Sequence, residues 1–494
     1  RANFSTKEGE QLMLKVALSP VSVEGAKANM EAELKGWNFE ATRKAAKKQW
    51  NEELAKVKIA GGDDAQKRVF YTALYHTMIA PSEFCDVNGD YRGADGEVHT
   101  NPGHKTYTTY SLWDTYRAEH PFLMLMKPTQ ARDMAMSMIR HQQQSVHKLL
   151  PVWSHMANDN WCMSGYHATS VLADAIAKGA DINPDEALKA MVETSNVGYL
   201  EGLGEYIELG YVPLEASGTA ASTTLEYCYD DWTIYKTALA AGNTEVAEQY
   251  KQRALNYRNI YDSEIGYARP KYRDGSFKKE FDVLQTHGEG FIEGNSWNFS
   301  FHVPHDVFGV INHMGGEKEF LRKLDELFAM HLPEKYYEKN EDITIDCLIG
   351  GYVHGNEPSH HIAYLYNYVG HQEKCAERVR QILTELYFDD HSGVCGNEDA
   401  GQMSAWYVLS AIGLYQVDPA AGEFQFGSPI VHKATLNVGS GKTFTVIAHN
   451  NTMENIYIQD VKLNGKPHAG TSITYDQIKA GGTLEFTMGA TPVK

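Results

Sequence analysis

The sequence predicts a mainly α-helical protein, an α/α toroid of six helical hairpins, with a smaller β-rich C-terminal segment. Two observations predict this fold class. From about residue 65 to residue 418, apolar residues recur at helical spacing, and several apolar helices end at a glycine before a more charged helix begins. After Pro419 the pattern changes to the apolar–polar alternation that is typical of strands.

The N-terminal part contains two predicted elements. Residues 10–20, EQLMLKVALSP, have the composition of a strand, and residues 37–57 have the pattern of an amphipathic helix with a basic face. Gly61, Gly62 and Asp63 then break this helix. We therefore assign residues 29–64 to a linker helix that precedes the main helical domain, residues 65–418.

Twelve helices are predicted within the main domain. They are expected to begin near residues 65, 111, 128, 167, 184, 222, 243, 302, 316, 358, 371 and 401. Helices that are apolar on most sides must be surrounded by protein, whereas their charged partners can face water. Six such pairs predict a ring with the apolar helices inside. The alternative is an open solenoid of hairpins, but the irregular spacing of the pairs and their long loops favour the closed ring.

The C-terminal segment, residues 419–494, is predicted to be β-rich. Its stretches KATLNVGSGKTFTVIAHNN and ENIYIQDVKLNGKPHA alternate apolar and polar residues, and Asn464-Gly465 is a hairpin turn signal. A short run of strands needs partners to form a stable sheet. We expect the strand at residues 10–20 to supply one.

Composition excludes several classes of function. The net charge is −19 and the chain has no basic run, which argues against binding of nucleic acid. No apolar stretch is long enough to span a membrane. The six cysteines include no CxxC pair, so a zinc ribbon is excluded and mostly free, buried thiols are expected. No GxSxG elbow, Walker loop or Rossmann fingerprint is present.

Polar and aromatic residues collect where the predicted inner helices begin. The stretch YSLWDTYRAEHPF places Trp113, Asp114 and Arg117 together, as an intrahelical ion pair or as a clamp for a sugar. The stretch NDNWCMSGYHATS holds Trp161 and His167, which could equally form a loop and a helix cap. We take these five residues as candidate substrate-binding residues.

Two carboxylates are candidates for acid–base chemistry. Glu293 lies in GEGFIEGNSW, and its apolar, aromatic surroundings, including the candidate substrate-binding residue Trp297, are expected to raise its pKa, as a proton donor requires. A surface turn is the alternative. Asp399 lies in CGNEDAGQMSAW, where it could simply form a capping box with Gln402. Carboxylates and aromatics without basic groups fit a neutral polyhydroxylated substrate, and two distant carboxylates indicate glycoside hydrolysis.

The stretch GGYVHGNEPSHHIAYLYNYVG is a candidate metal site. Asn356 and Glu357 precede Pro358, which is expected at the first helical position. Their hard oxygen ligands suit Ca²⁺ better than a soft metal. His354 and its neighbouring histidines raise the alternative of zinc, although no HExxH or Cys/His spacing is present.

The chain resembles glycoside hydrolase family 92. The resemblance covers roughly residues 30–494 and rests on six blocks in the family's order: SLWDTYR, GYHATSVLADA, TLEYCYDDW, EGNSWNFSFHVPHDV, GNEPSHHIAYLYN and GNEDAGQMSAWYVLSAIGLYQV. Members are bacterial, calcium-dependent, inverting exo-α-mannosidases that act on N-glycans and yeast mannan. The resemblance implies a periplasmic or secreted protein and a mannose-containing glycan substrate.

The resemblance also implies residue roles. Glu293 matches the catalytic acid and Asp399 the general base, whereas Asn397 stands where some members have a second aspartate. Asn356 and Glu357 lie in the block that contributes to the calcium site. Other residues match blocks that bind the terminal mannose or lie beside them, and the predicted substrate-binding set is Trp113, Asp114, Arg117, Trp161, His167, Trp297 and His354.

The family has an N-terminal β-sandwich domain before its toroid. Residues 1–28 resemble the last strand and exit linker of that sandwich, so a separate domain or chain is expected to complete the active site. Two rivals to an α-mannosidase remain. A polysaccharide lyase would need a basic cleft, which the charge of −19 disfavours. A non-catalytic glycan-binding protein would not need both carboxylates.

Overall fold

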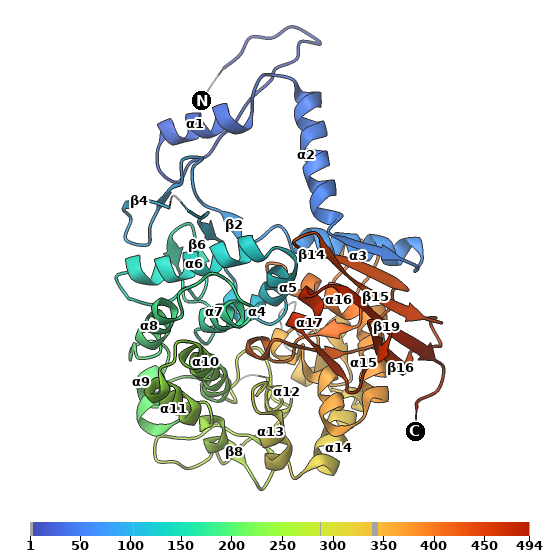
Figure 1. Ribbon diagram of the computed structural model, residues 1–494. Helices are drawn as coiled ribbons and strands as arrows, with labels where there is room; N and C mark the ends of the chain where they lie inside the picture. Colours follow the sequence, from blue (N-terminus) through green and yellow to red (C-terminus); the bar gives the residue numbers. More distant parts are fainter. Residues whose placement is uncertain (1–2, 102, 287, 338–343, 494) are drawn as a thin grey trace.

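A computed structural model describes residues 3–101, 103–286, 288–337 and 344–493. Its described part is mainly helical, with a β-sheet at the C-terminal end, as the sequence predicts (Figure 1). Among the described residues, no helix is both long enough and apolar enough to cross a membrane. The six cysteines, all within the described residues, are thiols outside any disulfide, and four of them are buried, which confirms the expectation of mostly unbridged, buried thiols.

The helices of the main domain pack as pairs of chain neighbours. The pairs are α5 (Glu119–Met126) with α6 (Pro128–Gln144), α7 (Ala168–Ala177) with α8 (Pro184–Thr194), α10 (Ala220–Ala240) with α11 (Thr244–Arg253), α13 (Val307–His313) with α14 (Glu317–Ala329), and the 3-10 helix η5 (Ile362–Val369) with α15 (Gln372–Glu385). The last helix of this series, α16 (Gln402–Ala411), packs against the first, α3 (Asp64–His76). The series of pairs therefore returns to its starting point.

The two members of a pair differ in burial, as their sequences predict. In the pair α10–α11, most residues of α10 are buried, whereas α11 buries Ala247 and Tyr250 and is otherwise more exposed. Glycines end the apolar members: Gly179 after α7 and Gly242 after α10 both have positive φ, which a residue with a side chain rarely adopts. The core of the domain thus lies among the apolar helices.

Three details of the predicted helices are wrong. The helix expected near residue 302 is replaced by α12 (Ser296–Phe299) and α13, separated by a loop. The helix expected near residue 358 is a pair of 3-10 helices, η4 (Glu357–Ser359) and η5, with Pro358 second rather than first. The helix expected near residue 111 breaks between α4 (Leu112–Thr115) and α5, so Asp114 and Arg117 do not share a continuous helix.

The C-terminal segment forms a six-stranded sheet of order β1-β14-β15-β19-β16-β17. Its strands are β1 (Val57–Ala60), β14 (Lys433–Gly439), β15 (Lys442–His449), β19 (Gly482–Gly489), β16 (Tyr457–Leu463) and β17 (Lys466–Pro467). Only β15 and β19 run parallel within this sheet. The predicted turn at Asn464-Gly465 joins β16 to β17, and both residues have positive φ.

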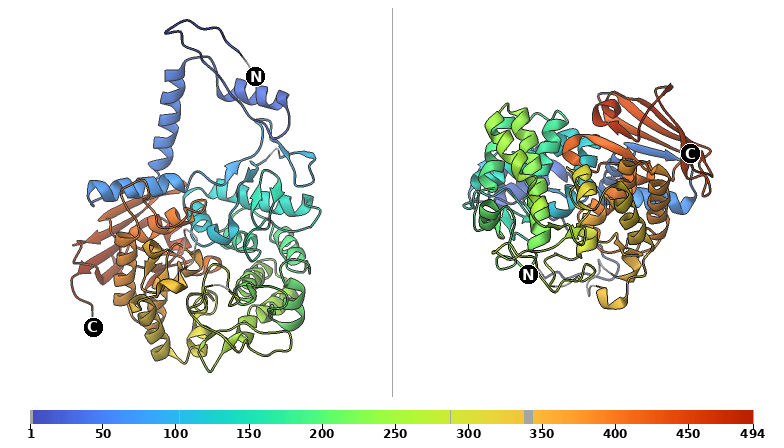
Figure 2. Two further views of the ribbon diagram at one scale, coloured as in Figure 1. Left: turned by 180° about the vertical axis from the view of Figure 1, so that it is seen from behind. Right: turned by 90° about the horizontal axis from the view of Figure 1, so that it is seen from below.

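The strand predicted at residues 10–20 is wrong, because these residues are irregular. The sheet instead takes its N-terminal strand from β1, which pairs with β14. Residues 3–56 project from the body as an arm that carries α1 (Val23–Glu33) and α2 (Phe39–Leu54) (Figures 1 and 2). A strand without a neighbouring strand to bond has nothing to hold it extended.

The remaining elements are short. They are β2 (Ser82–Glu83), β3 (Asp90–Arg92), β4 (Val98–Thr100), β5 (Tyr107–Thr108), β6 (Ser154–His155), β7 (Asn158–Asp159), α9 (Leu203–Leu209), β8 (Tyr261–Asp262), β9 (Tyr267–Ala268), β10 (Leu348–Ile349), β11 (Tyr352–Val353), β12 (Leu414–Tyr415), β13 (Glu423–Phe426), β18 (Ser472–Thr474) and α17 (Tyr475–Lys479). Most of the two-stranded hairpins lie in the loops that join helical pairs. These loops carry the candidate site.

Candidate active site

Three acidic side chains from distant segments converge at one point. Asp114 comes from α4, Glu357 from η4, and Asp399 from the turn before α16. One carboxylate oxygen from each lies within 4.8 Å of the other two. Asp114 and Glu357 are each 2% exposed, and Asp399 is half-buried. The sequence analysis assigned these residues to three different roles and did not predict that they meet.

Burial and mutual repulsion raise the pKa of two of these acids. Burial is the largest cause at Asp114, and the charges of Asp399 and Glu293 add to it, while a hydrogen bond from Ser111 opposes it. Burial and the charges of Asp399 and Asp114 likewise raise the pKa of Glu357. Oxygen Oε1 of Glu357 is buried without a hydrogen-bond partner. A cation among these oxygens would remove both penalties.

The turn that carries Asp399 is not the capping box that its sequence suggested. The N-cap of α16 is Gly401, so Asp399 lies two residues before the N-cap. Asp399, Ala400 and Gly401 have φ of 55°, 54° and 104°, a run of left-handed residues that positions Asp399 ahead of the helix. Glu398 stabilises the turn, because its Oε2 accepts a hydrogen bond from the Gly401 amide at 2.8 Å. The side chain of Gln402 binds elsewhere.

Glu293 lies beside the predicted metal-site stretch. Nδ2 of Asn356 donates a hydrogen bond to Oε2 of Glu293 at 3.2 Å. Asn356 therefore contacts the candidate acid, and its neighbour Glu357 belongs to the group of three acids. Glu293 is half-buried and has a φ of 49°, again in the left-handed region. Non-glycine residues with such backbone are uncommon and often functional.

Three predicted substrate-binding residues surround a buried carboxylate that the sequence analysis did not single out, Glu226 of α10. Trp113 donates its indole N–H to Glu226 at 3.0 Å, and Arg117 and His167 lie 3.4 Å and 3.5 Å from its oxygens. His302 adds a contact at 2.7 Å. Burial would raise the pKa of Glu226, but the charges of His302, Arg117 and His167 hold it below its usual range.

Arg117 connects this network electrostatically to the group of three acids. Arg117 is 5% exposed. Burial alone would lower its pKa, but the negative charges of its neighbours, including Glu226, Glu357 and Asp114, raise it. The signal for Glu226 was present in the sequence. TLEYCYDDW places Glu226, Asp230 and Asp231 in a helix that is mostly buried, and buried carboxylates are rarely found without partners.

The other predicted substrate-binding residues differ in exposure. Trp161 is 38% exposed, and its ring meets that of His147 edge-on at 4.6 Å. Trp297 is 8% exposed and packs on Tyr267. His354 is fully buried, with Nδ1 and Nε2 hydrogen-bonded to the hydroxyls of Tyr352 and Tyr387. Of these three, Trp161 has the most indole surface free for a ligand.

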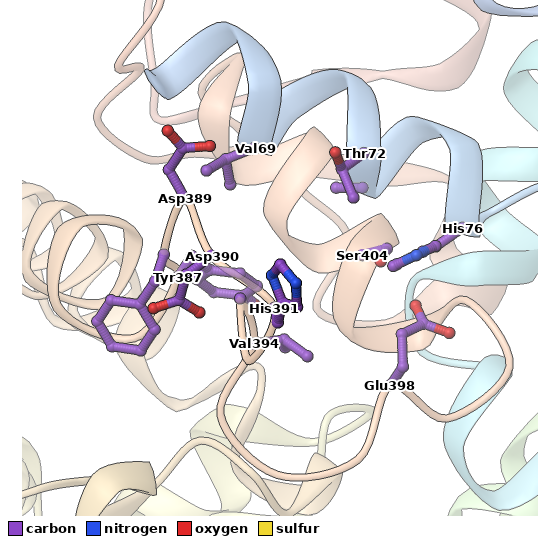
Figure 3. A pocket seen from close by; sticks show the side chains of 13 residues that line it. Val69, Thr72, His76, Tyr387, Asp389, Asp390, His391, Val394, Glu398 and Ser404 are labelled. Atoms are coloured by element: carbon purple, nitrogen blue, oxygen red, sulfur yellow. The ribbon is translucent and has the colours of Figure 1, made fainter. Parts of the chain in front are cut away.

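A cavity of about 290 Å³ opens beside Asp399. Residues after β5 and in or beside β6 line it, among them Thr109, Ser111, Trp153 and His155, together with the turn at residues 397–400. A second cavity of similar volume shares Glu398 with the first and lies between α3 and residues 387–398 (Figure 3). Val69, Thr72 and His76 of α3 face it, and none of the predicted site residues lines it.

The donor set favours a hard cation. Within the described residues, the group of potential metal ligands that converges consists of the three acids Asp114, Glu357 and Asp399. The histidines that raised the zinc alternative are hydrogen-bonded to protein: His302 to Glu226, His360 to the His354 carbonyl, and His361 to the Phe301 carbonyl. Carboxylate oxygens without nitrogen or sulfur ligands suit calcium or magnesium.

A family model for the glycosyl hydrolase family 92 catalytic domain matches residues 25–490. The chain belongs to glycoside hydrolase family 92. Within this family it is similar to the α-mannosidase BT3965 from Bacteroides thetaiotaomicron, whose complex with mannoimidazole it matches with 38% identity and a TM-score of 0.92 over 96% of this chain and 63% of that one. The resemblance that the sequence blocks indicated is thereby confirmed.

Two further relatives extend the comparison. The inverting family 92 mannosidase BT2199 from Bacteroides thetaiotaomicron is 35% identical, with a TM-score of 0.88 and coverage of 96% of this chain and 66% of that one. A protein described as an uncharacterized secreted glycosidase from Arthroderma benhamiae is 27% identical over 521 residues, or 96% of this chain and 60% of that protein. The chain therefore spans about three fifths of the length of its relatives.

Proposed function

We propose that this family 92 chain forms the catalytic part of an inverting exo-α-mannosidase that releases terminal α-linked mannose from N-glycans or mannans. One observation carries the proposal. In a chain of this family, Asp114, Glu357 and Asp399 converge from three segments, and Glu293 contributes to the electrostatic field at the same point. Acids without a nearby nucleophilic serine or cysteine constellation fit glycoside hydrolysis.

The proposed mechanism is a single displacement. Glu293 protonates the leaving oxygen, and the hydrogen bond from Asn356 orients its carboxyl group. Asp399 removes a proton from the water that attacks the opposite face of the sugar. Inversion requires room for this water, so we expect the two carboxyl groups to lie about 6.5 to 9.5 Å apart. Glutamate at position 293 favours a glycosidic leaving group, because a leaving phosphate needs no proton.

Asp114, Glu357 and Asp399 are the residues that would hold a calcium ion. Bound calcium would supply coordination of the sugar hydroxyls 2 and 3 and help to distort the ring. The fit rests on hard oxygen donors, on the unpartnered Oε1 of Glu357 and on the raised pKa of two of the acids. We also propose Asn356, the other predicted ligand, which would bind the ion through the carbonyl oxygen of its side chain.

The remaining assignments are proposals that follow from the family. We propose a closed α/α toroid, which the packing of α16 on α3 supports. We also propose an α-1,2 linkage, a periplasmic or secreted location, and a partner β-sandwich domain that completes the site. The arm supports such a partner, because Leu14, Leu18 and Phe39 are 77%, 82% and 68% exposed. Exposed apolar groups on one segment commonly mark an interface.

The test uses the full chain with mannobioses of defined α-1,2, α-1,3, α-1,4 and α-1,6 linkage. We expect free mannose from one linkage above the others, with β-mannose as the first anomer seen by proton NMR. Chelator should abolish release, and calcium should restore it. Because the relatives are longer, the assay is repeated with a family β-sandwich domain added in trans.

Three results would contradict the proposal. They are α-mannose as the first anomer, restoration by zinc alone, and binding without turnover in both forms of the assay. The last result would favour a glycan-binding protein.

A further inference from the structure

Gln402 is the first residue of α16 and is completely buried. Its Oε1 accepts hydrogen bonds from the backbone amides of Ala118 at 2.8 Å and Glu119 at 3.2 Å. Its Nε2 lies 2.9 Å from Nδ1 of His360. Because the two amides can only donate, the orientation of the Gln402 side-chain amide is fixed, and Nε2 donates to His360.

These partners belong to the three segments that carry the acids. Ala118 lies four residues after Asp114, His360 three after Glu357, and Gln402 itself three after Asp399. Nε2 of His360 donates in turn to the carbonyl of His354 at 3.0 Å, which links the same network back to the start of the Glu357 segment. One buried side chain thus bonds all three segments.

The three segments need such a link. Buried carboxylates that lie within 4.8 Å of one another repel, and this repulsion favours separation of the segments whenever no cation is bound. The left-handed backbone of Asp399 and Ala400, just before Gln402, also costs free energy that the surrounding structure must offset. Buried hydrogen bonds to Gln402 oppose both effects, because breaking them leaves polar groups without partners.

We propose that Gln402 is a positioning residue that holds the segments of Asp114, Glu357 and Asp399 together, so that the acids stay converged without a cation. The inference rests on the proposed function only for its catalytic consequence. The sequence analysis treated Gln402 as half of a capping box, a role that the structure does not give it. The side chain of Gln402 bonds the neighbouring segments and does not cap the helix to which it belongs.

Two variants separate the two halves of the link. Gln402→Glu keeps an acceptor for the Ala118 and Glu119 amides but loses the donor to His360 when ionised. Gln402→Met has similar volume and loses both. Gln416→Met is the matched control, because Gln416 is also buried and bonds Lys178 and the Pro419 carbonyl, away from the three segments.

The first measurement is amide hydrogen exchange of the full chain without added metal. In Gln402→Met we expect exchange at least about tenfold faster in peptides covering residues 117–121, 356–361 and 397–403 together. In Gln402→Glu we expect the effect mainly at residues 356–361. Gln416→Met should leave all three peptides unchanged. Faster exchange confined to residues 401–404, or the same pattern in the control, would overturn the proposal.

The second measurement tests the effect of Gln402 on function. Titration calorimetry measures calcium affinity, and steady-state kinetics measures turnover of an aryl mannoside. We expect Gln402→Met to lose at least about tenfold in affinity and to lower kcat more than it raises KM, with Gln402→Glu intermediate. If the unaltered chain neither binds calcium nor hydrolyses mannosides, the proposed function fails, while the exchange pattern still decides the role of Gln402. If Gln402→Met does not fold, the exchange pattern of Gln402→Glu decides it.

Discussion

Glu293 and Asp399 have the same uncommon backbone conformation, with φ of 49° and 55°. A short turn into a helix follows each of them. Gly294 and the N-cap residue Asn295 come after Glu293, and Gly401, with a φ of 104°, comes soon after Asp399. Left-handed backbone costs free energy for any residue with a side chain, and it persists where the surrounding structure enforces it. The two carboxylates predicted to do the chemistry are therefore aimed by strained turns.

The two acids should respond differently to the leaving group. Glu293→Gln should lower kcat on mannobiose by roughly 100- to 10,000-fold but spare activated aryl mannosides, whose leaving groups need no proton. Asp399→Asn should lower both rates, because water must be activated whatever leaves. Steady-state kinetics on the two substrate types measures the contrast. Equal sensitivity of both variants to the leaving group would contradict these roles.

Glu357→Gln should have opposite effects with and without calcium. Without calcium it removes an acid whose pKa is raised by burial and by the charges of Asp399 and Asp114, so the midpoint of thermal unfolding should stay the same or rise. With calcium the affinity should fall by at least about tenfold, equivalent to about 1.4 kcal/mol. Differential scanning fluorimetry across a calcium titration measures the unfolding midpoint of the variant and of the unaltered protein with and without the ion. A variant destabilised equally in both conditions would argue against a cation site.

Sequence patterns located the candidate site residues one by one but could not show which of them meet. Asp114 and Asp399 were separated by most of the helical domain, so nothing local indicated that both lie within 4.8 Å of Glu357. Glu226 was missed because it and the other acids of α10, Asp230 and Asp231, match no catalytic or metal-binding spacing motif. Trp113 was expected to cover a sugar, yet its indole N–H is bonded to Glu226.

At the scale of elements, the turn from Glu398 to Gly401 is the feature that the sequence suggested least well. Asp399 and Gln402 have the spacing of a capping box, and local sequence alone favours that arrangement. Instead Gln402 turns away to bond Ala118 and Glu119, contacts that depend on how α5 packs beside α16. Tertiary contacts override the local preference here.

Gly401→Ala tests how tightly this turn is packed. A Cβ at Gly401 would lie 2.7 Å from Cδ of the buried Glu119, at a φ of 104°. We expect destabilisation beyond the roughly 1–2 kcal/mol of left-handed strain, together with loss of activity because Asp399 moves. Gly422→Ala is the matched control, since φ there is also positive and no atom lies within 4 Å of the added Cβ.

Urea unfolding gives the free energy of unfolding of Gly401→Ala and Gly422→Ala, and steady-state kinetics gives their kcat. The control should lose only about 1–2 kcal/mol and keep its activity. Similar losses in both variants would mean that strain, and not the contact with Glu119, limits the turn.

At the scale of the whole molecule, the helical pairs were predictable because their signals are local. Apolar periodicity and terminating glycines placed every predicted helix start except the one near residue 302 within three residues of an observed helix start, as at α8 and α15. The same local signals could not show that β1, and not residues 10–20, would supply the N-terminal strand of the sheet. Four residues, Val57–Ala60, give too short an alternation to distinguish a strand from the end of the preceding helix.

Buried histidines should make the fold sensitive to acid. Burial lowers the pKa of His120, His354 and His361 to about 3. Below pH 6.5 the unfolded chain binds protons that the folded chain excludes, so stability falls as pH drops from 6.5 toward 3. Each histidine should contribute about 1.4 kcal/mol of loss per pH unit, or about 2 kcal/mol at pH 5.

His120→Leu isolates one of these contributions, because neither ring nitrogen of His120 has a hydrogen-bond partner. The difference in unfolding free energy between pH 7 and pH 5 should shrink by about 2 kcal/mol in this variant. The same change at the exposed His391 serves as the control. An unchanged pH dependence in His120→Leu would show that the buried ring is protonated in the folded protein.

The packing of α3 on α16 and of β1 on β14 also governs how the chain can be made. During synthesis β1 and α3 leave the ribosome long before α16 and β14, the elements against which they pack. Closing so long a loop is slow, and the waiting apolar face can aggregate. We therefore expect the yield of folded protein to depend on how long the apolar face of α3 stays uncovered before translation reaches α16.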